Sequence, residues 1–197
     1  RDTLALLYSL DNQQDKALRL LLASNEGDDK ARIFELIVKH NLHETVRHSV
    51  LQLMRLDCER ATLLLADSLE IIDIDTVVGQ LHDESELQLE YLHKLATMQM
   101  QEYNQLRYSD HHSRQVALYV RHRPKDLLAF LERSVFFDLE QALEVCEQLA
   151  LHRETVHILG RMGNTDEALR LLVEKICDVR QTVEFVEQHR ENSALWD

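Results

Sequence analysis

Short, one-sided helices with frequent stop signals constrain this chain more than any other feature, and residues 138–188 show them best. Isolated helices of this length are marginally stable in water. Each needs neighbouring helices to cover its apolar face, which is the arrangement of an α-solenoid. The apolar side chains that recur at helical spacing in the first of these helices are Leu139, Ala142, Leu143, Cys146 and Leu149. Those in a later helix are Ala168, Leu171 and Leu172, and those in the last helix are Val179, Val183 and Val186.

The composition favours an all-α fold. The chain of 197 residues contains one Pro, four Gly and 6% aromatic residues, so it offers few of the turn signals and β-favouring side chains of a sheet protein. A chain of this length can bury one core or a continuous strip of core. Because the rhythm of helix and turn continues along the sequence, we predict a single α-solenoid over residues 1–197, as one segment of a longer protein.

Net charge and cysteine content limit the partners and the cellular compartment that we expect for this chain. The 22 Lys and Arg against 35 Asp and Glu give a formal net charge of −13, which argues against nucleic acid as a partner. The short basic stretch 121–125 is expected to be solvated. Cys58, Cys146 and Cys177 form no closely spaced pair, so we expect small buried side chains in a reducing compartment. The longest apolar runs are only a few residues and no leader precedes them, which predicts a soluble chain.

Turn and capping residues predict where the helices begin and end. Pro124 suits a first helical position, and Gly163 suits a left-handed residue that ends a helix. Residues 71–75 alternate like a strand, but an isolated strand has no partner, so we expect a loop there. The predicted capping residues are Asp57, Asp83 with Glu86, Asn164 with Glu167, and Asp178 with Gln181. Helices are expected at about 3–10, 14–23, 29–40, 43–56, 58–69, 75–81, 83–103, 109–122, from 124, 138–146, 154–162, 165–174 and from 178.

Two short segments recur within the sequence, which is consistent with a repeat. Residues 15–21 (DKALRLL) return at 166–172 as DEALRLL, and residues 42–46 (LHETV) nearly return at 151–156 as LHRETV. Leu-rich helices also share such short segments by chance, so the regular alternation of helix and turn is the stronger evidence for a repeat. The sequence does not show the fixed marker residues of a tetratricopeptide array, which repeat about every 34 residues.

Eleven histidines invite a test for a metal site. Two Glu-x-x-His elements, Glu90 to His93 and Glu154 to His157, match the ligand spacing of di-iron helical bundles. With 19 Glu and 11 His in 197 residues, roughly one such pair is expected by chance. Those bundles also need four long parallel helices, which the turn spacing does not supply. We therefore predict no metal and no other cofactor.

Other sequence motifs that occur in catalytic sites are equally weak evidence for an enzyme. The pair His82-Asp83 occurs in helical phosphohydrolases, but that site needs further ligands at set distances. We find no phosphate loop, Asp-rich motif or nucleophile signature, so no catalytic residue is assigned and an enzyme is not expected. Five further histidines are expected to be solvated or to lie at helix ends: His40, His43, His48, His111 and His112.

The aromatic residues Phe136, Phe137 and Trp196 have two interpretations. Aromatic side chains are enriched at the hot spots of protein interfaces, so these three could anchor a partner. More often such side chains fill the core between adjoining helices, and we favour that interpretation. No partner-binding residue is assigned from the sequence.

Several stretches from residue 116 onward resemble one known family. They include Arg123-Pro124-Lys125-Asp126, Leu139-Glu140-Gln141-Ala142, Gly160-Arg161-Met162-Gly163-Asn164 and Leu195-Trp196. These stretches resemble the clathrin heavy-chain repeat of the vacuolar protein sorting-associated protein 41 family, with the best match over residues 116–197. The resemblance implies a right-handed α-α superhelix. We find no counterpart in this sequence of the β-propeller and RING-type zinc module that flank the repeat in that family.

The resemblance also implies a function. Members of the family are subunits of the HOPS tethering complex, which bridges late endosomes, autophagosomes and lysosomes or vacuoles before SNARE-driven fusion. The expected role is a non-catalytic scaffold in vesicle-mediated protein transport, cytoplasmic and held peripherally and indirectly on late endosome, lysosome or vacuole and transport vesicle membranes. Expected partners are the other HOPS core subunits, small GTPases that bind mainly outside this segment, and further copies of the chain.

Two alternatives stay open. The chain could be the α-solenoid of another coat or scaffold, such as clathrin, coatomer or the nuclear pore, which flanking sequence would distinguish. The other alternative is a helical metalloenzyme, which requires a polar cavity lined by Glu90, His93, Glu154 and His157.

Overall fold

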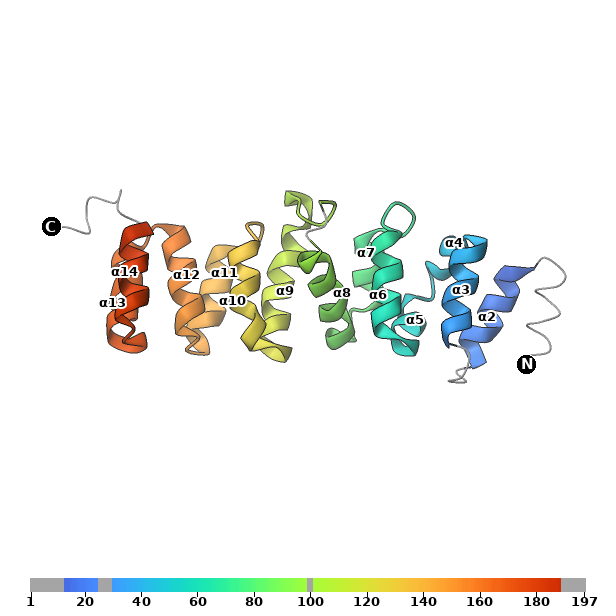
Figure 1. Ribbon diagram of the computed structural model, residues 1–197, viewed down its shortest axis with the longest axis horizontal. Helices are drawn as coiled ribbons and strands as arrows, with labels where there is room; N and C mark the ends of the chain where they lie inside the picture. The colour runs from blue at the N-terminus through green and yellow to red at the C-terminus, as the bar shows by residue number, and fades with distance from the viewer. Residues whose placement is uncertain (1–12, 25–29, 99–100, 189–197) are drawn as a thin grey trace. The chain divides into compact units, whose positions relative to one another are not determined.

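The computed structural model describes residues 13–24, 30–98 and 101–188, and these ranges are almost entirely helical (Figure 1). Thirteen α-helices occur there, together with a short 3-10 helix and a π-helical turn, and no strand is present within the described ranges. The prediction of an all-α fold is confirmed. The helix predicted at 3–10 and the side chain of Trp196 lie outside the described residues.

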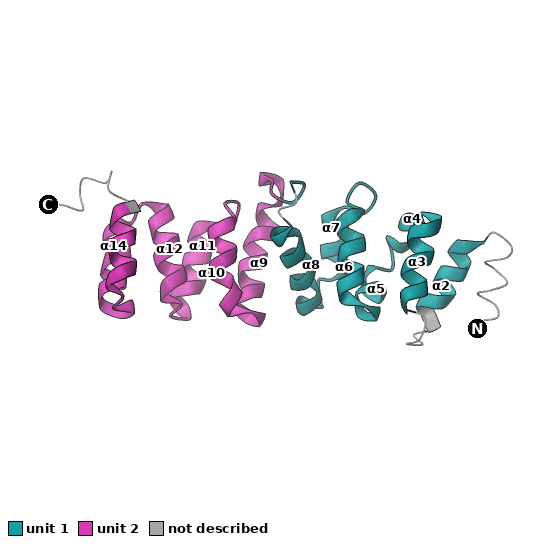
Figure 2. Ribbon diagram, viewed as in Figure 1, with its two compact units in different colours: residues 1–103 teal, residues 104–197 magenta. Residues whose placement is uncertain are grey.

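The chain divides into two compact units, Arg1–Tyr103 and Asn104–Asp197 (Figure 2). Within unit 1, α2 packs on α3, α3 on α4, α5 on α6 and α7, and α6 on α8. Contacts of this kind, between near neighbours in the sequence, are typical of a solenoid. The described helices of unit 1 are α2 (Gln14–Ser24), α3 (Lys30–His40), α4 (His43–Val46), α5 (Val50–Leu56), α6 (Cys58–Asp67), α7 (Ile74–Gln80) and α8 (Ser85–Thr97).

Unit 2 repeats this organisation. The helix α9 packs on α10 and α11, α12 packs on α10, α11 and α13, and η3 contacts α12, α13 and α14. Successive helices of unit 2 run in opposite directions (Figure 1), so the predicted stack of antiparallel helices is confirmed in this unit. Its described elements are η2 (Leu106–Tyr108), α9 (Ser109–His122), α10 (Pro124–Arg133), α11 (Leu139–Gln148), α12 (His152–Met162), α13 (Thr165–Leu171), the π-helical turn η3 (Leu172–Ile176) and α14 (Val179–Gln188).

Four aspartates cap helices, because each offers a carboxylate oxygen to a backbone N–H that the helix itself leaves unbonded. The carboxylate of Asp57 accepts from the N–H three residues later at 3.0 Å, and Asp73, Asp138 and Asp178 do the same at 2.6, 2.9 and 3.2 Å. The predicted caps at Asp57 and Asp178 are confirmed. Pro124 is the first residue of α10, as predicted.

The predicted capping boxes at Asp83 and Asn164 are wrong. The N-cap of α8 is Glu84, and neither Glu84 nor Asn164 accepts a capping hydrogen bond through its side chain. Three of the capping aspartates have extended backbones with ψ of 100°, 157° and 117°, whereas ψ is 71° at Glu84 and 58° at Asn164. A short side chain needs the extended backbone to reach the N–H groups of the first turn.

The single helix predicted at 43–56 is also wrong, because the chain breaks between α4 and α5. The side-chain amide of Gln80 in α7 bridges the break, donating to the Arg47 carbonyl at 2.5 Å and accepting from the Val50 N–H at 3.2 Å. A broken helix leaves backbone groups without helical partners, and Gln80 satisfies two of them. Ser49 is the N-cap of α5, but its side chain makes no capping hydrogen bond, and the group that bridges the break lies 33 residues after Arg47.

Two further helices end earlier than predicted. The helix α8 ends at Thr97 rather than near 103, and the Thr97 hydroxyl donates to the carbonyls of His93 and Lys94 at 2.9 and 3.0 Å, which competes with helical bonding. The helix predicted at 165–174 changes to the π-helical turn after Leu171. That turn ends at Cys177, whose backbone is left-handed with φ of 55°.

The predicted apolar faces of two helices are partly wrong. Leu149 is 54% exposed, because it follows α11 at the helix end. In α14 the buried residue is Phe185, at 8% exposure, whereas the predicted face residues Val179 and Val183 are 79% and 51% exposed. Burying the aromatic ring removes more apolar area from water than burying a valine, so the ring decides which side of α14 faces the core.

Candidate functional site

The turn between α10 and α11, residues 134–138, is held on one side by α9. His112 of α9 is fully buried, and its Nδ1 shares a 2.8 Å hydrogen bond with the Ser134 hydroxyl. The same ring stacks on Phe130 with 6.0 Å between centroids and lies 5.5 Å from the ring of Phe136. A polar ring enclosed in this way needs a hydrogen-bond partner. The pair of His112 and Ser134 therefore fixes where the turn begins.

On the other side, α12 supplies two side chains to the C-terminal end of α10. Arg161 donates to the Ser134 carbonyl at 2.9 Å, and its guanidinium lies 4.7 Å from the centre of the Phe137 ring. The Nε2 atom of His157 lies 3.2 Å from the Leu131 carbonyl oxygen. The last carbonyls of a helix have no partner within it, and a cation there also complements the helix dipole. Arg161 and His157 therefore cap α10 and join it to α12.

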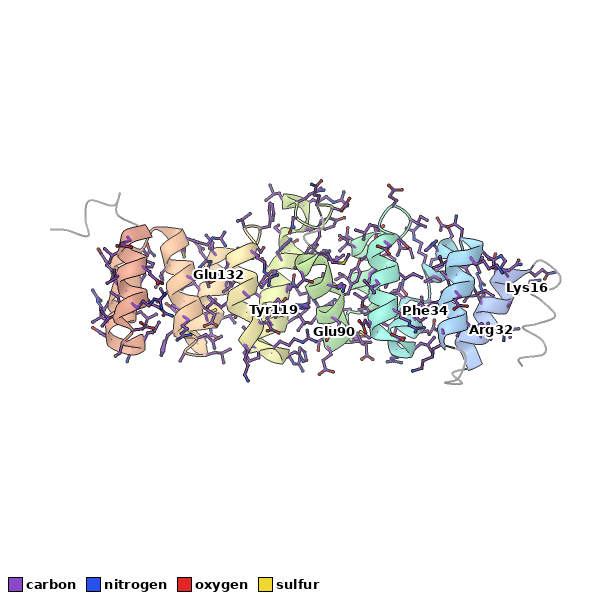
Figure 3. The ribbon with its side chains drawn as sticks, in the orientation of Figure 1. Lys16, Arg32, Phe34, Glu90, Tyr119 and Glu132 are labelled. Atoms are coloured by element: carbon purple, nitrogen blue, oxygen red, sulfur yellow. The ribbon has the colours of Figure 1, made fainter. Side chains whose placement is uncertain are left out.

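Burial changes the proton affinity of several groups in unit 2. It lowers the pKa of His157 below its ordinary value; the hydrogen bond to the Leu131 carbonyl opposes this effect and the charge of Arg161 adds to it. Burial raises the pKa of the Cys146 thiol to about 12, and it raises the pKa of the Tyr119 phenol, labelled in Figure 3, to about 12. A thiol that stays protonated is a poor nucleophile. Cys146 and Tyr119 therefore act as packing groups at neutral pH.

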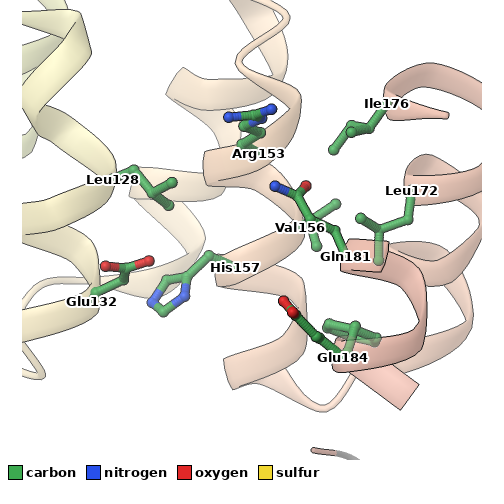
Figure 4. Close-up of a pocket in the computed structure, with 10 residues that line it drawn as sticks. Leu128, Glu132, Arg153, Val156, His157, Leu172, Ile176, Gln181 and Glu184 are labelled. Atoms are coloured by element: carbon green, nitrogen blue, oxygen red, sulfur yellow. The ribbon is translucent and has the colours of Figure 1, made fainter. Parts of the chain in front are cut away.

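A groove crosses α12 in unit 2 (Figure 4). Leu128 and Glu132 of α10 line one wall, Gln181 and Glu184 of α14 line the opposite wall, and Val156 of α12 contributes to the floor. Its volume is about 190 Å³. Because it combines an apolar floor with polar walls, it is the candidate interaction site of unit 2.

The two Glu-x-x-His elements lie in different units. Glu90 and His93 belong to α8 of unit 1, where Figure 3 labels Glu90, and Glu154 and His157 belong to α12 of unit 2. In the part of the chain that the structure describes, no three His, Cys, Asp or Glu side chains form a group that could hold a metal ion. The His157 ring binds a backbone carbonyl instead, as described above.

The histidines expected at the surface or at helix ends differ from one another. His40 and His48 are exposed, and His43 is the first residue of α4 and shares a 2.8 Å hydrogen bond with the Ser68 hydroxyl. His112 lies in the first turn of α9, at a helix end, but it is not solvated: it is fully buried, and a serine hydroxyl satisfies its ring nitrogen.

The aromatic and cysteine predictions have mixed outcomes. Phe137 is buried and lies 6.3 Å from the Phe130 ring, which confirms the core interpretation for Phe137. Phe136 is half-buried. Cys146 is buried as predicted, but Cys177 is exposed, since it ends η3 at the surface of unit 2.

The basic stretch 121–125, predicted to be solvated, is exposed at Arg121 and Lys125 and partly buried at His122 and Arg123. His82 and Asp83 are exposed. None of the helices in the described ranges has the length and apolar character needed to span a bilayer.

Sequence reasoning missed the two side chains that cap α10 together. His157 and Arg161 are four residues apart, so a helix places them on one face, and this spacing was the available signal. The spacing alone does not identify the carbonyls that they meet, because those belong to a different helix.

The fold and these contacts define a helical-repeat protein, in which polar side chains cap and bridge short helices and the candidate site is a groove between them. Comparison with known proteins supplies the family. The family described as the Vps41 TPR-like region matches residues 1–197, and the chain belongs to this family.

Curated relatives come from plants, animals and yeast. The chain is 39% identical to a vacuolar protein sorting-associated protein 41 homolog of Solanum lycopersicum, over 100% of this chain and 20% of that protein. It is 37% identical to the homolog of Homo sapiens, over 99% of this chain and 22% of that protein. It is 28% identical to vacuolar protein sorting-associated protein 41 of Schizosaccharomyces pombe, over 100% of this chain and 22% of that protein. The chain thus spans about a fifth of the length of these relatives, and no solved structure matches it significantly.

Proposed function

We propose that the chain is a non-catalytic scaffold segment of a HOPS-type tethering subunit. It acts in vesicle-mediated protein transport and in the fusion of late endosomes and autophagosomes with the lysosome or vacuole. The observation that carries this proposal is family membership over all 197 residues, together with relatives named for vacuolar protein sorting. Stacked helices support it, because a solenoid offers extended surface to partners and keeps the modules at its ends apart.

The chemistry of unit 2 supports a non-catalytic role. The rings of His112 and His157 bind a serine hydroxyl and a backbone carbonyl, and burial keeps the Cys146 thiol protonated through its raised pKa. Groups with such partners stabilise helix packing. A general base or nucleophile needs instead a pKa matched to its task and access to a substrate.

The partners follow from this role. We propose direct contacts with other HOPS core subunits, contacts with small GTPases of late endosomes or lysosomes through regions outside this segment, and self-association of further copies. The protein is cytoplasmic in this proposal, and its attachment to membranes is peripheral and indirect. The net charge of −13 supports indirect attachment, because an anionic leaflet repels a strongly acidic chain.

A spacer requires one continuous stack, so we propose that both units belong to a single α-solenoid over residues 1–197. Small-angle X-ray scattering tests this. A compact chain of this length has a radius of gyration of about 16 Å, and we expect a clearly larger value with the profile of an elongated particle. The profile of a compact sphere would contradict the spacer role.

A pull-down with purified subunits tests the tethering role. With the whole chain as bait, we expect at least one HOPS core subunit to be retained. A second bait that starts at Asp110 shows which part of the chain is needed, since it lacks unit 1 and η2. Clathrin, coatomer and nuclear-pore subunits serve as competing preys. Retention of one of these in place of every HOPS subunit would assign the chain to another scaffold.

A further inference from the structure

The floor of the groove across α12 is part of the fixed core of unit 2. Val156, Leu172 and Phe185 line the groove and belong to one packed cluster of buried residues. A ligand therefore meets a surface that is already ordered and does not have to order it on binding. With a volume of about 190 Å³, the groove has room for a long side chain but not for a folded element.

Two carboxylates from opposite walls reach this space. Glu132 belongs to α10 and Glu184 to α14, and Figure 4 shows them on opposite sides of the His157 ring, with Arg153 toward the other end of the groove. His157 also lines the groove, but burial lowers its pKa, so at neutral pH it does not offset the two negative charges. Arg180 pairs with Glu184 at 3.0 Å from the exposed side of α14. Such exposed pairs are weak and exchange readily.

We propose that this groove binds an arginine side chain of a partner protein, with its methylene stem on Val156 and Leu172 and its guanidinium between Glu132 and Glu184. Arginine combines an apolar stem with a planar head whose N–H groups match two carboxylates. At the end of the groove away from Arg153, an acidic side chain is repelled by the two glutamates, and an apolar one desolvates them without giving hydrogen bonds in return. The inference rests on the docking role proposed above and specifies the chemistry of one contact.

Nuclear magnetic resonance titration of the whole ¹⁵N-labelled chain tests the inference. The probes are three acetylated tripeptide amides, Gly-Arg-Gly, Gly-citrulline-Gly and Gly-Glu-Gly, where citrulline keeps the shape of arginine without its charge. We expect the arginine peptide to shift the signals of Val156, Leu172 and Phe185 in a saturable way, and to bind about tenfold or more tightly than the citrulline peptide. Equal binding of the arginine and citrulline peptides, or no binding at all, overturns the inference.

A pair of double variants provides the control. The double variant Glu132→Gln with Glu184→Gln keeps the shape of the groove and removes both carboxylates, so the preference for arginine should disappear. The double variant Glu140→Gln with Glu147→Gln, at exposed positions of α11 outside the groove, makes the same change in net charge and should keep the preference. If both variants keep it, the groove is not the site. Retention of HOPS subunits without peptide binding leaves the docking role standing and removes only this inference.

Discussion

His157 makes the packing of α12 against α10 depend on pH. Because burial lowers the pKa of His157 in the folded chain, the unfolded chain binds a proton at this ring more readily. Stability rises with pH wherever the unfolded state binds more protons. The stabilisation is therefore complete above the unfolded pKa of about 6.5, and it is lost as the pH falls from that value toward the lower folded pKa.

Urea unfolding at about pH 7.5 and about pH 5.5 measures this dependence. The comparison uses the natural chain and the variant His157→Gln, whose amide can still donate to the Leu131 carbonyl. We expect the natural chain to lose more free energy of unfolding than the variant on acidification, because the variant has no ring to charge. The rest of the sequence is the same in both proteins, so its contributions cancel in the comparison. Equal losses in the two proteins would show that His157 does not carry the pH dependence.

Gln80 is the second residue whose substitution should lower the stability of the chain. The variant Gln80→Ala removes the amide that bonds the Arg47 carbonyl and the Val50 N–H, so both backbone groups lose a partly buried partner. We expect a loss of about 1–3 kcal/mol in the free energy of unfolding of unit 1, measured by urea denaturation. The matched variant Gln52→Ala, at an exposed position of α5, should change it by less than about 0.5 kcal/mol. Similar effects of the two variants would exclude the bridging role.

At the scale of helices, the sequence predicts features whose partners lie within one turn. Asp57 caps the N–H three residues ahead, Pro124 needs no partner at a first helical position, and Gly163 supplies a left-handed backbone with φ of 81°. Gln80 and His112 act on groups 33 and 22 residues away. Local patterns contain no information about such distant partners, so the break after α4 and the buried His112 could not be predicted.

The second recurring segment, at residues 42–46 and 151–156, corresponds to a shared connection between helices. Asn41 and Ala150 both have left-handed backbones, with φ of 52° and 53°. The next residue in each case, Leu42 or Leu151, donates its N–H to the carbonyl five residues earlier, at 3.0 and 2.9 Å. A histidine then begins the following helix in both places. The shared geometry supports a repeated helix connection, which sequence similarity alone left open.

Two glycines predict opposite responses to the same substitution. A Cβ added at Gly79 or at Gly163 meets no atom within 4 Å, so the effect of alanine depends only on the backbone. Gly79 lies within the helix α7, where alanine should stabilise the chain by about 0.5–1 kcal/mol. Gly163 has φ of 81°, where alanine should destabilise it by about 1–2 kcal/mol. Thermal unfolding of Gly79→Ala and Gly163→Ala measures both, and effects of the same sign would refute the backbone argument.

At the scale of the whole chain, contacts between near neighbours should keep stability local. In a helical-repeat protein each element is stabilised mainly by the elements beside it, so a change in one place lowers the opening free energy of nearby helices. Gln80→Ala should act on unit 1, and Gly163→Ala on unit 2, because the altered bonds and backbone lie within those units.

Native-state hydrogen exchange followed by mass spectrometry separates local from global effects. For Gln80→Ala we expect amides of α5, α6 and α7 to exchange about fivefold faster or more, as a loss of roughly 1 kcal/mol or more requires, while α11, α12 and α13 keep their rates. For Gly163→Ala we expect the opposite result: amides of α11, α12 and α13 exchange faster, while α5, α6 and α7 keep their rates. A single cooperative body would instead show every slowly exchanging amide accelerated by the same factor in both variants. That result would mean that the two units unfold together and that near-neighbour contacts do not determine the stability of this chain.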